Sequence, residues 1–149
     1  MNTVHVASSD GVDIPIYDYA PGSTRGSVLF SHATGFHGRC FNSTAALIAD
    51  SAHCYSFDYR GYGDATLPHD WNVTWGGYGD DAQVVAQHVA RNNGPSIAFG
   101  HSMGGAALVM AALREPELFR ALVLFEPIIF PPIVRENGNA GGPSPLSQG

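Results

Sequence analysis

The sequence contains no lysine, and its basic residues are seven arginines scattered through a chain of 149 residues. Aspartate and glutamate together number 13, so the formal net charge at pH 7 is -6 with histidine neutral. Nucleic-acid binding needs a clustered basic surface, and a polybasic membrane anchor needs a run of lysine or arginine. The arginines form no such cluster, so the composition argues against both kinds of partner.

Cysteine and long hydrophobic runs are also scarce. The two cysteines, Cys40 and Cys54, are too few for a disulfide framework or a metal site of their own. No apolar run reaches the ~18 residues that a membrane-spanning helix needs. The first ten residues, MNTVHVASSD, lack the basic start and the apolar stretch of a secretory signal. We therefore expect a cytoplasmic chain with reduced thiols and no metal.

The residues that are present are typical of a folded domain with many turns: 44% are hydrophobic, with 18 glycines and 10 prolines. Valines and isoleucines alternate with other residues before and after Asp10 and Gly11, which predicts an antiparallel hairpin at the start of the chain. Pro15 has no amide hydrogen to donate to a neighbouring strand. The strand that contains Pro15 is therefore predicted to lie at a sheet edge.

Four short and almost continuously apolar runs follow, at residues 27–32, 54–59, 96–101 and 121–126. Such runs are typical of parallel strands that are covered on both faces. Helical periodicity fills the intervals between them. The predicted fold class is therefore α/β, with an N-terminal hairpin followed by parallel strands and right-handed crossover helices. Residues 131–149 are rich in glycine, proline and serine and are predicted to form a mobile tail.

The strongest chemical signal is GHSMGG at residues 100–105, a G-x-S-x-G pattern between an apolar strand and an apolar helix. A serine on such a turn projects its hydroxyl above the sheet edge, where it can act as a nucleophile. Ser102 occupies that position. The backbone amide of Met103, at the start of the helix, could stabilise a developing oxyanion. The alternative is a chance match, which the strand-turn-helix context argues against.

Two further loops follow apolar strands. SHATGFHG at residues 31–38 could supply a second oxyanion amide, or it could be an ordinary glycine turn. DYRGYGD at residues 58–64 contains Asp58 and Arg60, which we interpret as structural residues that hold the loop rather than as catalytic groups.

HATGFHG, DYRGYGD and GHSMGG, in this order and at these spacings, resemble the α/β-hydrolase superfamily, and most of all its esterase, haloperoxidase-like and epoxide-hydrolase-like branch. The resemblance implies a partial α/β-hydrolase core over residues 1–130 that lacks the last two strands of the family sheet. Residues 131–149 would then begin a cap segment. Matching His32, Ala33 and Thr34 to the family's loop places the other oxyanion amide at Thr34, and Ser102 matches the nucleophile.

The catalytic triad of this superfamily runs in the order serine, acid, histidine. All seven histidines lie at or before residue 101, so no histidine follows Ser102. Glu126, at the end of the last apolar run, is a candidate for the acid, and a plain loop carboxylate is the alternative. The sequence is therefore interpreted as the N-terminal half of a longer hydrolase whose catalytic histidine lies beyond residue 149.

The resemblance implies hydrolysis of an ester or related acyl bond through an acyl-enzyme, without a metal or organic cofactor. Phe36, His32 and His101 are candidate substrate contacts, although His101 should point away from Ser102 because neighbours on a sharp turn diverge. Two alternatives stay open, an inactive fragment and a ligand-binding relative without turnover. The expected partner is a small ester or acyl substrate, and self-association through an exposed last strand is a further expectation.

Overall fold

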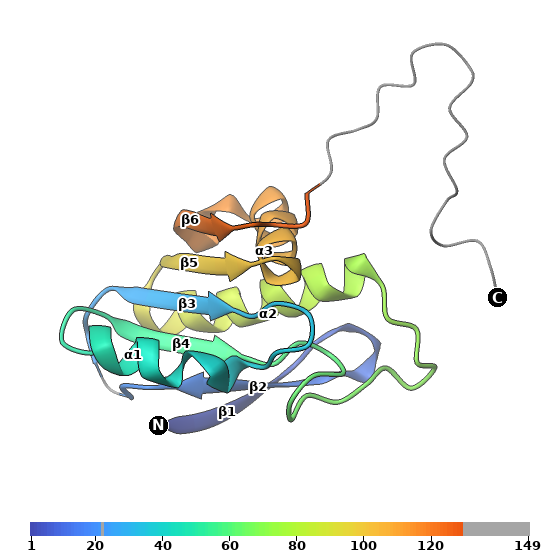
Figure 1. Cartoon of the computed structure of the whole chain (residues 1–149), viewed down its shortest axis with the longest axis horizontal. Helices are drawn as coiled ribbons and strands as arrows, with labels where there is room; N and C mark the ends of the chain where they lie inside the picture. The colour runs from blue at the N-terminus through green and yellow to red at the C-terminus, as the bar shows by residue number, and fades with distance from the viewer. Residues whose placement is uncertain (22, 130–149) are drawn as a thin grey trace, which may run out of the picture.

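The computed structural model describes residues 1–21 and 23–129, whose centre is a six-stranded sheet with the strand order β1-β2-β4-β3-β5-β6 (Figure 1). The strands are β1 (Asn2–Ala7), β2 (Asp13–Asp18), β3 (Ser27–Ser31), β4 (His53–Phe57), β5 (Ser96–His101) and β6 (Phe119–Phe125). The helices are α1 (Asn42–Ile48), α2 (Trp75–Asn93) and α3 (Met103–Arg114), with short 3-10 turns η1 (Ser9–Gly11), η2 (Gly38–Phe41) and η3 (Pro116–Leu118). Strands β3 to β6 are parallel to one another, which confirms the predicted α/β fold. The predicted tail, residues 131–149, lies outside the described residues.

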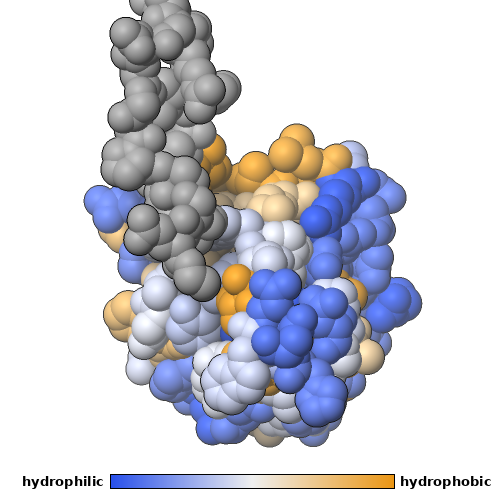
Figure 2. Space-filling model, turned by 90° about the vertical axis from the view of Figure 1, so that its right-hand side faces the viewer, coloured by the Kyte–Doolittle hydropathy of each residue, from blue (hydrophilic) through white to orange (hydrophobic). Residues whose placement is uncertain are grey.

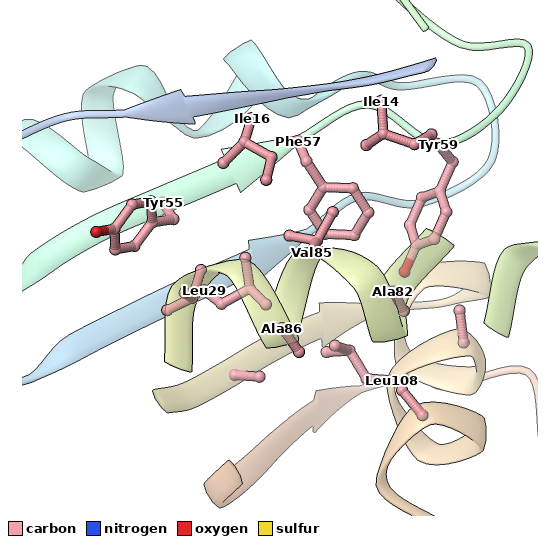
Figure 3. Packing of buried hydrophobic residues seen from close by; sticks show 14 of the residues in the cluster. Ile14, Ile16, Leu29, Tyr55, Phe57, Tyr59, Ala82, Val85, Ala86 and Leu108 are labelled. Atoms are coloured by element: carbon pink, nitrogen blue, oxygen red, sulfur yellow. The ribbon is translucent and has the colours of Figure 1, made fainter. Parts of the chain in front are cut away.

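Helices cover both faces of the sheet, with α1 on one face and α2 and α3 on the other (Figure 1). Successive side chains of a strand point to opposite faces, so each apolar strand serves two cores. In β3, Leu29 packs in the core under α2 and α3, whereas Phe30 packs in the smaller core under α1. Figure 3 shows the larger core, where strand side chains lie against Val85 and Ala86 of α2. This double coverage explains why the runs are continuously apolar instead of alternating.

The predicted N-terminal hairpin is confirmed, but the edge position predicted for its proline strand is wrong. β1 and β2 pair antiparallel from Asn2–Asp18 to Ala7–Asp13, and β2 also pairs with β4. The pairing of β2 with β4 ends at Ile16 and Phe57, one residue after Pro15 along β2. Pro15 therefore lies in an inner strand, opposite His5 of β1 and one residue outside the β2–β4 ladder. Its carbonyl accepts a hydrogen bond of 3.3 Å from the amide of Asp58.

β6 forms the second edge of the sheet within the described residues. The sequence predicted that both faces of this strand would be covered, which is wrong: the exposed fractions of Val123 and Phe125 are 50% and 53%. Only Phe119 and Leu122 pack against the larger core. The strand carries a single charged side chain, Arg120. An apolar strand with one free edge is a template for pairing with another chain.

We expect the 149-residue chain to self-associate through β6, and Val123→Lys to reduce that association because lysine on an edge strand opposes strand pairing. Light scattering at increasing protein concentration measures it. Leu47→Lys is the matched control, because Leu47 is 85% exposed on α1 and the substitution adds the same charge. A monomeric parent protein, or equal effects of the two lysines, would contradict the expectation.

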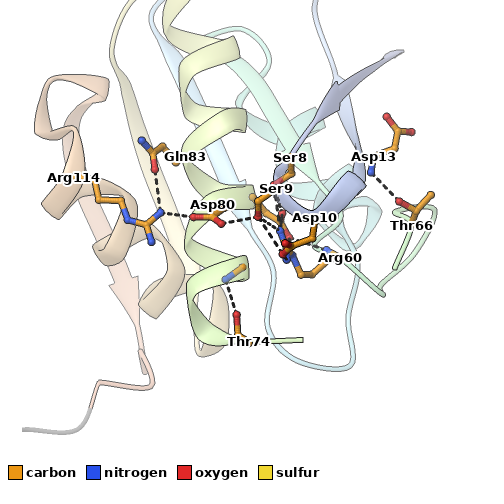
Figure 4. A network of polar contacts seen from close by, with 12 residues as sticks. Ser8, Ser9, Asp10, Asp13, Arg60, Thr66, Thr74, Asp80, Gln83 and Arg114 are labelled. Atoms are coloured by element: carbon orange, nitrogen blue, oxygen red, sulfur yellow. Dashed lines mark hydrogen bonds and ion pairs between the residues drawn. The ribbon is translucent and has the colours of Figure 1, made fainter. Parts of the chain in front are cut away.

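Arg60, in the loop after β4, forms a buried ion pair with α2 and also contacts the hairpin turn, where Figure 4 shows it beside Ser9 and Asp10. The guanidinium of Arg60, with no exposed surface, donates to both carboxylate oxygens of Asp81 at 2.9 and 2.8 Å. It also donates to Asp10 at 3.0 Å and to Ser9 at 2.9 Å, both in the hairpin turn. Burial by itself lowers the pKa of Arg60, but the hydrogen bonds and charges of Asp81 and Asp10 outweigh it and raise the pKa. Arg60 stays charged and connects three segments, in agreement with the structural role predicted for it.

Replacing Asp81 by asparagine should lower the free energy of unfolding by about 3–5 kcal/mol, because the buried Arg60 charge loses its buried carboxylate and keeps only the exposed Asp10 as a charged partner. Urea denaturation followed by circular dichroism measures the loss. Arg114→Gln is the control, since the Arg114–Asp80 pair is partly exposed and such pairs contribute about 0–1 kcal/mol. Equal losses in the two variants would show that burial of the Arg60 pair has no special importance.

Candidate active site

Ser102 occupies a sharp turn between β5 and α3. Its backbone has φ 53° and ψ -116°, a conformation that non-glycine residues rarely adopt and that costs about 1–3 kcal/mol. Backbone hydrogen bonds hold the turn: the amide of Ser102 donates to the carbonyl of Phe125 at 3.0 Å. The carbonyl of Ser102 accepts from Ala106 and Ile128, each at 3.2 Å. The segment that ends β6 thus fixes the serine from outside, while its side chain makes no capping bond to α3.

The glycines of GHSMGG permit a very close approach of α3 to the sheet. A Cβ added to Gly100 would lie 2.6 Å from the Cα of Gly105, and one added to Gly104 would lie 2.6 Å from the carbonyl oxygen of Ser31. Both distances are shorter than carbon atoms tolerate. The start of α3 therefore rests on the ends of β5 and β3. This contact sets the height of Ser102 above the sheet.

His32, the first residue after β3, has no exposed surface. Its Nδ1 lies 2.8 Å from the carbonyl oxygen of Ala33, and its Nε2 accepts the amide hydrogen of Tyr59 at 3.1 Å. These partners require a neutral ring that carries its hydrogen on Nδ1. Burial lowers the pKa of His32, which favours the same neutral form. A neighbouring loop covers the ring, and both of its nitrogens lie against backbone groups, so the substrate contact predicted for His32 stays a prediction that these partners do not favour.

Asp58 holds the loop that carries Thr34 in place. Its buried carboxylate accepts hydrogen bonds from the amide of Gly38 at 2.6 Å, the hydroxyl of Tyr17 at 2.6 Å and the amide of Asp64 at 2.8 Å. Burial and the bond to Asp58 raise the pKa of Tyr17, so its hydroxyl remains a donor. Asp58 thus joins the two glycine-rich loops after β3 and β4, which is the structural role that the sequence predicted for it.

Thr34 and Met103 line the same pocket, of about 460 Å³, at the carboxyl ends of the strands. The remaining lining residues come from the loop after β4, the start of α2 and the segment after β6: Tyr62, Asn72, Val73, Thr74, Trp75, Tyr78 and Ile128. Most of these were missed by the sequence analysis. The available signal was the cluster of aromatic residues just before and within the first turn of α2.

Phe36 and His101 lie away from this pocket. Side chains two residues apart on a strand share a face, and Phe99 packs in the core under α1, so His101 also lies on the α1 side. The ring of His101 is 5.1 Å from that of Phe125 and 6.4 Å from that of Phe36. The structure therefore brings these two predicted substrate contacts together, but on the face opposite the lining residues contributed by α2.

Glu126 follows β6 directly and is exposed, with φ 44°. It comes one residue after Phe125, whose carbonyl binds the amide of Ser102, so its backbone lies at the rim beside the turn. Within residues 1–21 and 23–129, no three histidine, cysteine or acidic side chains group together as a metal site would require. In the same part of the chain, no helix is long and apolar enough to cross a membrane.

The fold and the turn at Ser102 define an α/β-hydrolase. The structure superimposes with a TM-score of 0.70 on a hydrolase from Pseudomonas aeruginosa PA01, with 22% sequence identity, covering 83% of this chain and 45% of that one. The sequence profile described as serine aminopeptidase, S33, matches residues 22–139. The chain therefore belongs to the S33 family of α/β-hydrolases.

Curated relatives in this family include lipases. The chain is 29% identical over 121 residues to lipase LipV of Mycobacterium tuberculosis, covering 79% of this chain and 43% of the lipase. It is 26% identical over 136 residues to human monoglyceride lipase, covering 84% of this chain and 43% of that enzyme. The chain thus spans less than half the length of these relatives. At the level of the family, they support a hydrolase.

The burial of neutral His32 predicts a loss of stability in mild acid. Because its folded pKa lies below the ordinary value of 6.5, the unfolded chain binds a proton first, so the free energy of unfolding falls as the pH decreases through about 6.5. His32→Gln should flatten this dependence between about pH 7.5 and about pH 5.5, measured by urea denaturation at each pH. His88, whose pKa is also lowered, leaves a residual slope. Identical slopes in the two proteins would refute this role of His32.

Proposed function

We propose that this chain carries the nucleophile half of a hydrolase that cleaves carboxylic esters of lipid type through an acyl-enzyme on Ser102. The observation that carries the proposal is the backbone of Ser102, which is held in a costly conformation between β5 and α3. Such strain is maintained where it positions a reacting group. The lipases among the relatives support an ester of this class as the substrate.

The proposed oxyanion site consists of the backbone amides of Thr34 and Met103. A trans peptide points the carbonyl of one residue and the amide of the next in opposite directions. The carbonyl of Ala33 faces the buried ring of His32, so the amide of Thr34 points away from that ring. Met103 begins α3, where backbone amides are free of helical partners. Both residues line one pocket, which supports their joint action.

In the proposed reaction, the Ser102 oxygen attacks the ester carbonyl carbon as its proton passes to a base, and the carbonyl oxygen becomes an oxyanion held by the two amides. Collapse breaks the bond to the alcohol, which leaves with that proton. Water then cleaves the acyl-enzyme by the same steps and releases the acid. No metal or organic cofactor takes part in these steps.

The base is proposed to come from outside the 149 residues. No hydrogen bond within the described part of the chain joins a histidine to Ser102. Both ring nitrogens of His32 lie against backbone groups. His53 pairs with Asp18 at the amino end of β4, whereas Ser102 follows the carboxyl end of the parallel strand β5. Glu126 remains the proposed acid, because its backbone lies beside the turn. A ligand-binding relative without turnover is the second candidate, and it is supported by the observation that no histidine of the described residues is hydrogen-bonded to Ser102.

We expect the 149-residue chain to hydrolyse a short p-nitrophenyl ester only feebly, because the oxyanion amides act without a base; catalysis of this residual kind reaches about 10³–10⁴-fold over water. A fluorophosphonate should nevertheless label Ser102 slowly, as detected by mass spectrometry of the intact chain and its peptides. Ser102→Ala should abolish the labelling, and Ser43→Ala, an exposed serine of α1, should leave it unchanged.

Rapid ester turnover that Ser102→Ala abolishes would show that one of the seven histidines, or a second chain, supplies the base. Labelling that persists in Ser102→Ala, or a complete absence of labelling, would instead favour the ligand-binding candidate over the hydrolase.

A further inference from the structure

Both tryptophans of the chain lie on one exposed segment between β4 and α2. Trp71 is 74% exposed, Trp75 is 43% exposed, and Val73 between them is 40% exposed. Figure 1 shows this loop, in green, reaching further beyond the carboxyl ends of the strands than any other described segment. The three exposed apolar residues therefore lie on the segment between this projecting loop and the start of α2, which we call the tryptophan tip (residues 71–75).

The tip has a defined shape. The amide of Trp71 donates to the carbonyl of Pro68 at 3.0 Å, and the amide of Asn72 donates to the carboxylate of Asp70 at 3.0 Å. Thr74 caps α2 by accepting the amide of Gly77 at 3.1 Å. Trp71 itself has φ 58°, which is unfavourable for a bulky residue. Trp71 thus keeps an unfavourable backbone conformation while most of its large aromatic side chain is exposed to solvent.

The charge around the tip selects among possible partners. Between residues 68 and 76 the only ionisable side chains are His69 and Asp70, and the whole chain carries a net charge of -6. A nucleic acid or an anionic membrane would be repelled rather than attracted. Tryptophan prefers the boundary between hydrocarbon and polar headgroups, and the intervening Asn72 and Thr74 suit the same depth. A projecting tip also fits a flat, deformable surface better than it fits a groove.

The tip adjoins two pockets. Trp75 and Ile128 line both the pocket that contains Thr34 and a second, apolar pocket of about 340 Å³ against α3. Figure 2 looks onto the carboxyl ends of the strands and shows hydrophobic surface gathered along the top of this side, where α3 and the end of β6 lie. We propose that the tryptophan tip docks the chain onto an electrically neutral, zwitterionic lipid surface, with both pocket openings next to it. Docking of this kind goes beyond the proposed hydrolysis and does not require Ser102.

Tryptophan emission, excited at wavelengths that the six tyrosines do not absorb, reports on this tip alone, because both tryptophans of the chain lie in it. Titration with phosphatidylcholine vesicles should shift the emission to shorter wavelength, and brominated phosphatidylcholine should quench it. In the single-tryptophan variants Trp75→Phe and Trp71→Phe, the shift should be larger for Trp71, which is the more exposed of the two. Vesicles that contain phosphatidylglycerol should bind more weakly at low salt.

Trp71→Ser should weaken sedimentation with phosphatidylcholine vesicles about tenfold, as expected when one large apolar side chain no longer leaves water. Leu113→Ser is the matched control, because Leu113 is 80% exposed at the far end of α3 and its loss should leave binding unchanged. Circular dichroism checks that both variants fold. Ser102→Ala should bind vesicles like the parent, so failure of docking and failure of the proposed hydrolysis are separate results.

Several outcomes would overturn the docking proposal. The emission could stay unchanged with vesicles, or Leu113→Ser could weaken binding as much as Trp71→Ser. A shift with protein concentration alone would indicate that the tip binds a second copy. A water-soluble short-chain ester that shifts Trp71 as strongly as vesicles do would indicate a pocket ligand instead of a surface.

Discussion

The backbone of Ser102 is the constraint on which the site depends. A serine at φ 53° keeps that conformation only because the neighbouring structure leaves no alternative. The amide of Ser102 is bound by β6, its carbonyl is bound by the segment after β6, and α3 rests on β5 through Gly100 and Gly105. The conformational cost at Ser102 is thus offset by contacts among β5, β6 and α3. The position of the Ser102 hydroxyl therefore depends on all three elements.

Two buried carboxylates hold the neighbouring loops in place. Asp58 accepts hydrogen bonds from two glycine-rich loops and from Tyr17, and Asp81 neutralises Arg60 beside the hairpin turn. Each carboxylate is buried, so its hydrogen bonds and ion pairs must offset the free energy of hydration that it loses on folding. The loop that carries Thr34 is therefore fixed before any ligand arrives. The oxyanion role proposed for the Thr34 amide needs such a fixed loop, because a preorganised donor stabilises a developing charge without having to reorient.

The parts of the site that the sequence predicted are those determined by local chemistry. The glycines of GHSMGG predicted the close approach of a helix to a strand, and so the turn at Ser102. The position of Asp58 and Arg60 directly after an apolar run predicted that both residues are structural. The parts it missed depend on neighbours distant in the chain. His32 is buried because the loop after β4 folds over it. The free edge of β6 was expected, but the cover expected on both of its faces is incomplete. An apolar stretch of sequence does not show which distant segments will cover it.

Acyl transfer at Ser102, as proposed, depends on the direction of two backbone amides, those of Thr34 and Met103, relative to the serine hydroxyl. A crystal structure of the chain with a tetrahedral phosphonate bound to Ser102 tests this claim most directly. One phosphoryl oxygen is expected at about 2.7–3.1 Å from the amide nitrogens of both Thr34 and Met103. A phosphoryl group turned to solvent, with either amide hydrogen-bonded elsewhere in the protein, would contradict it.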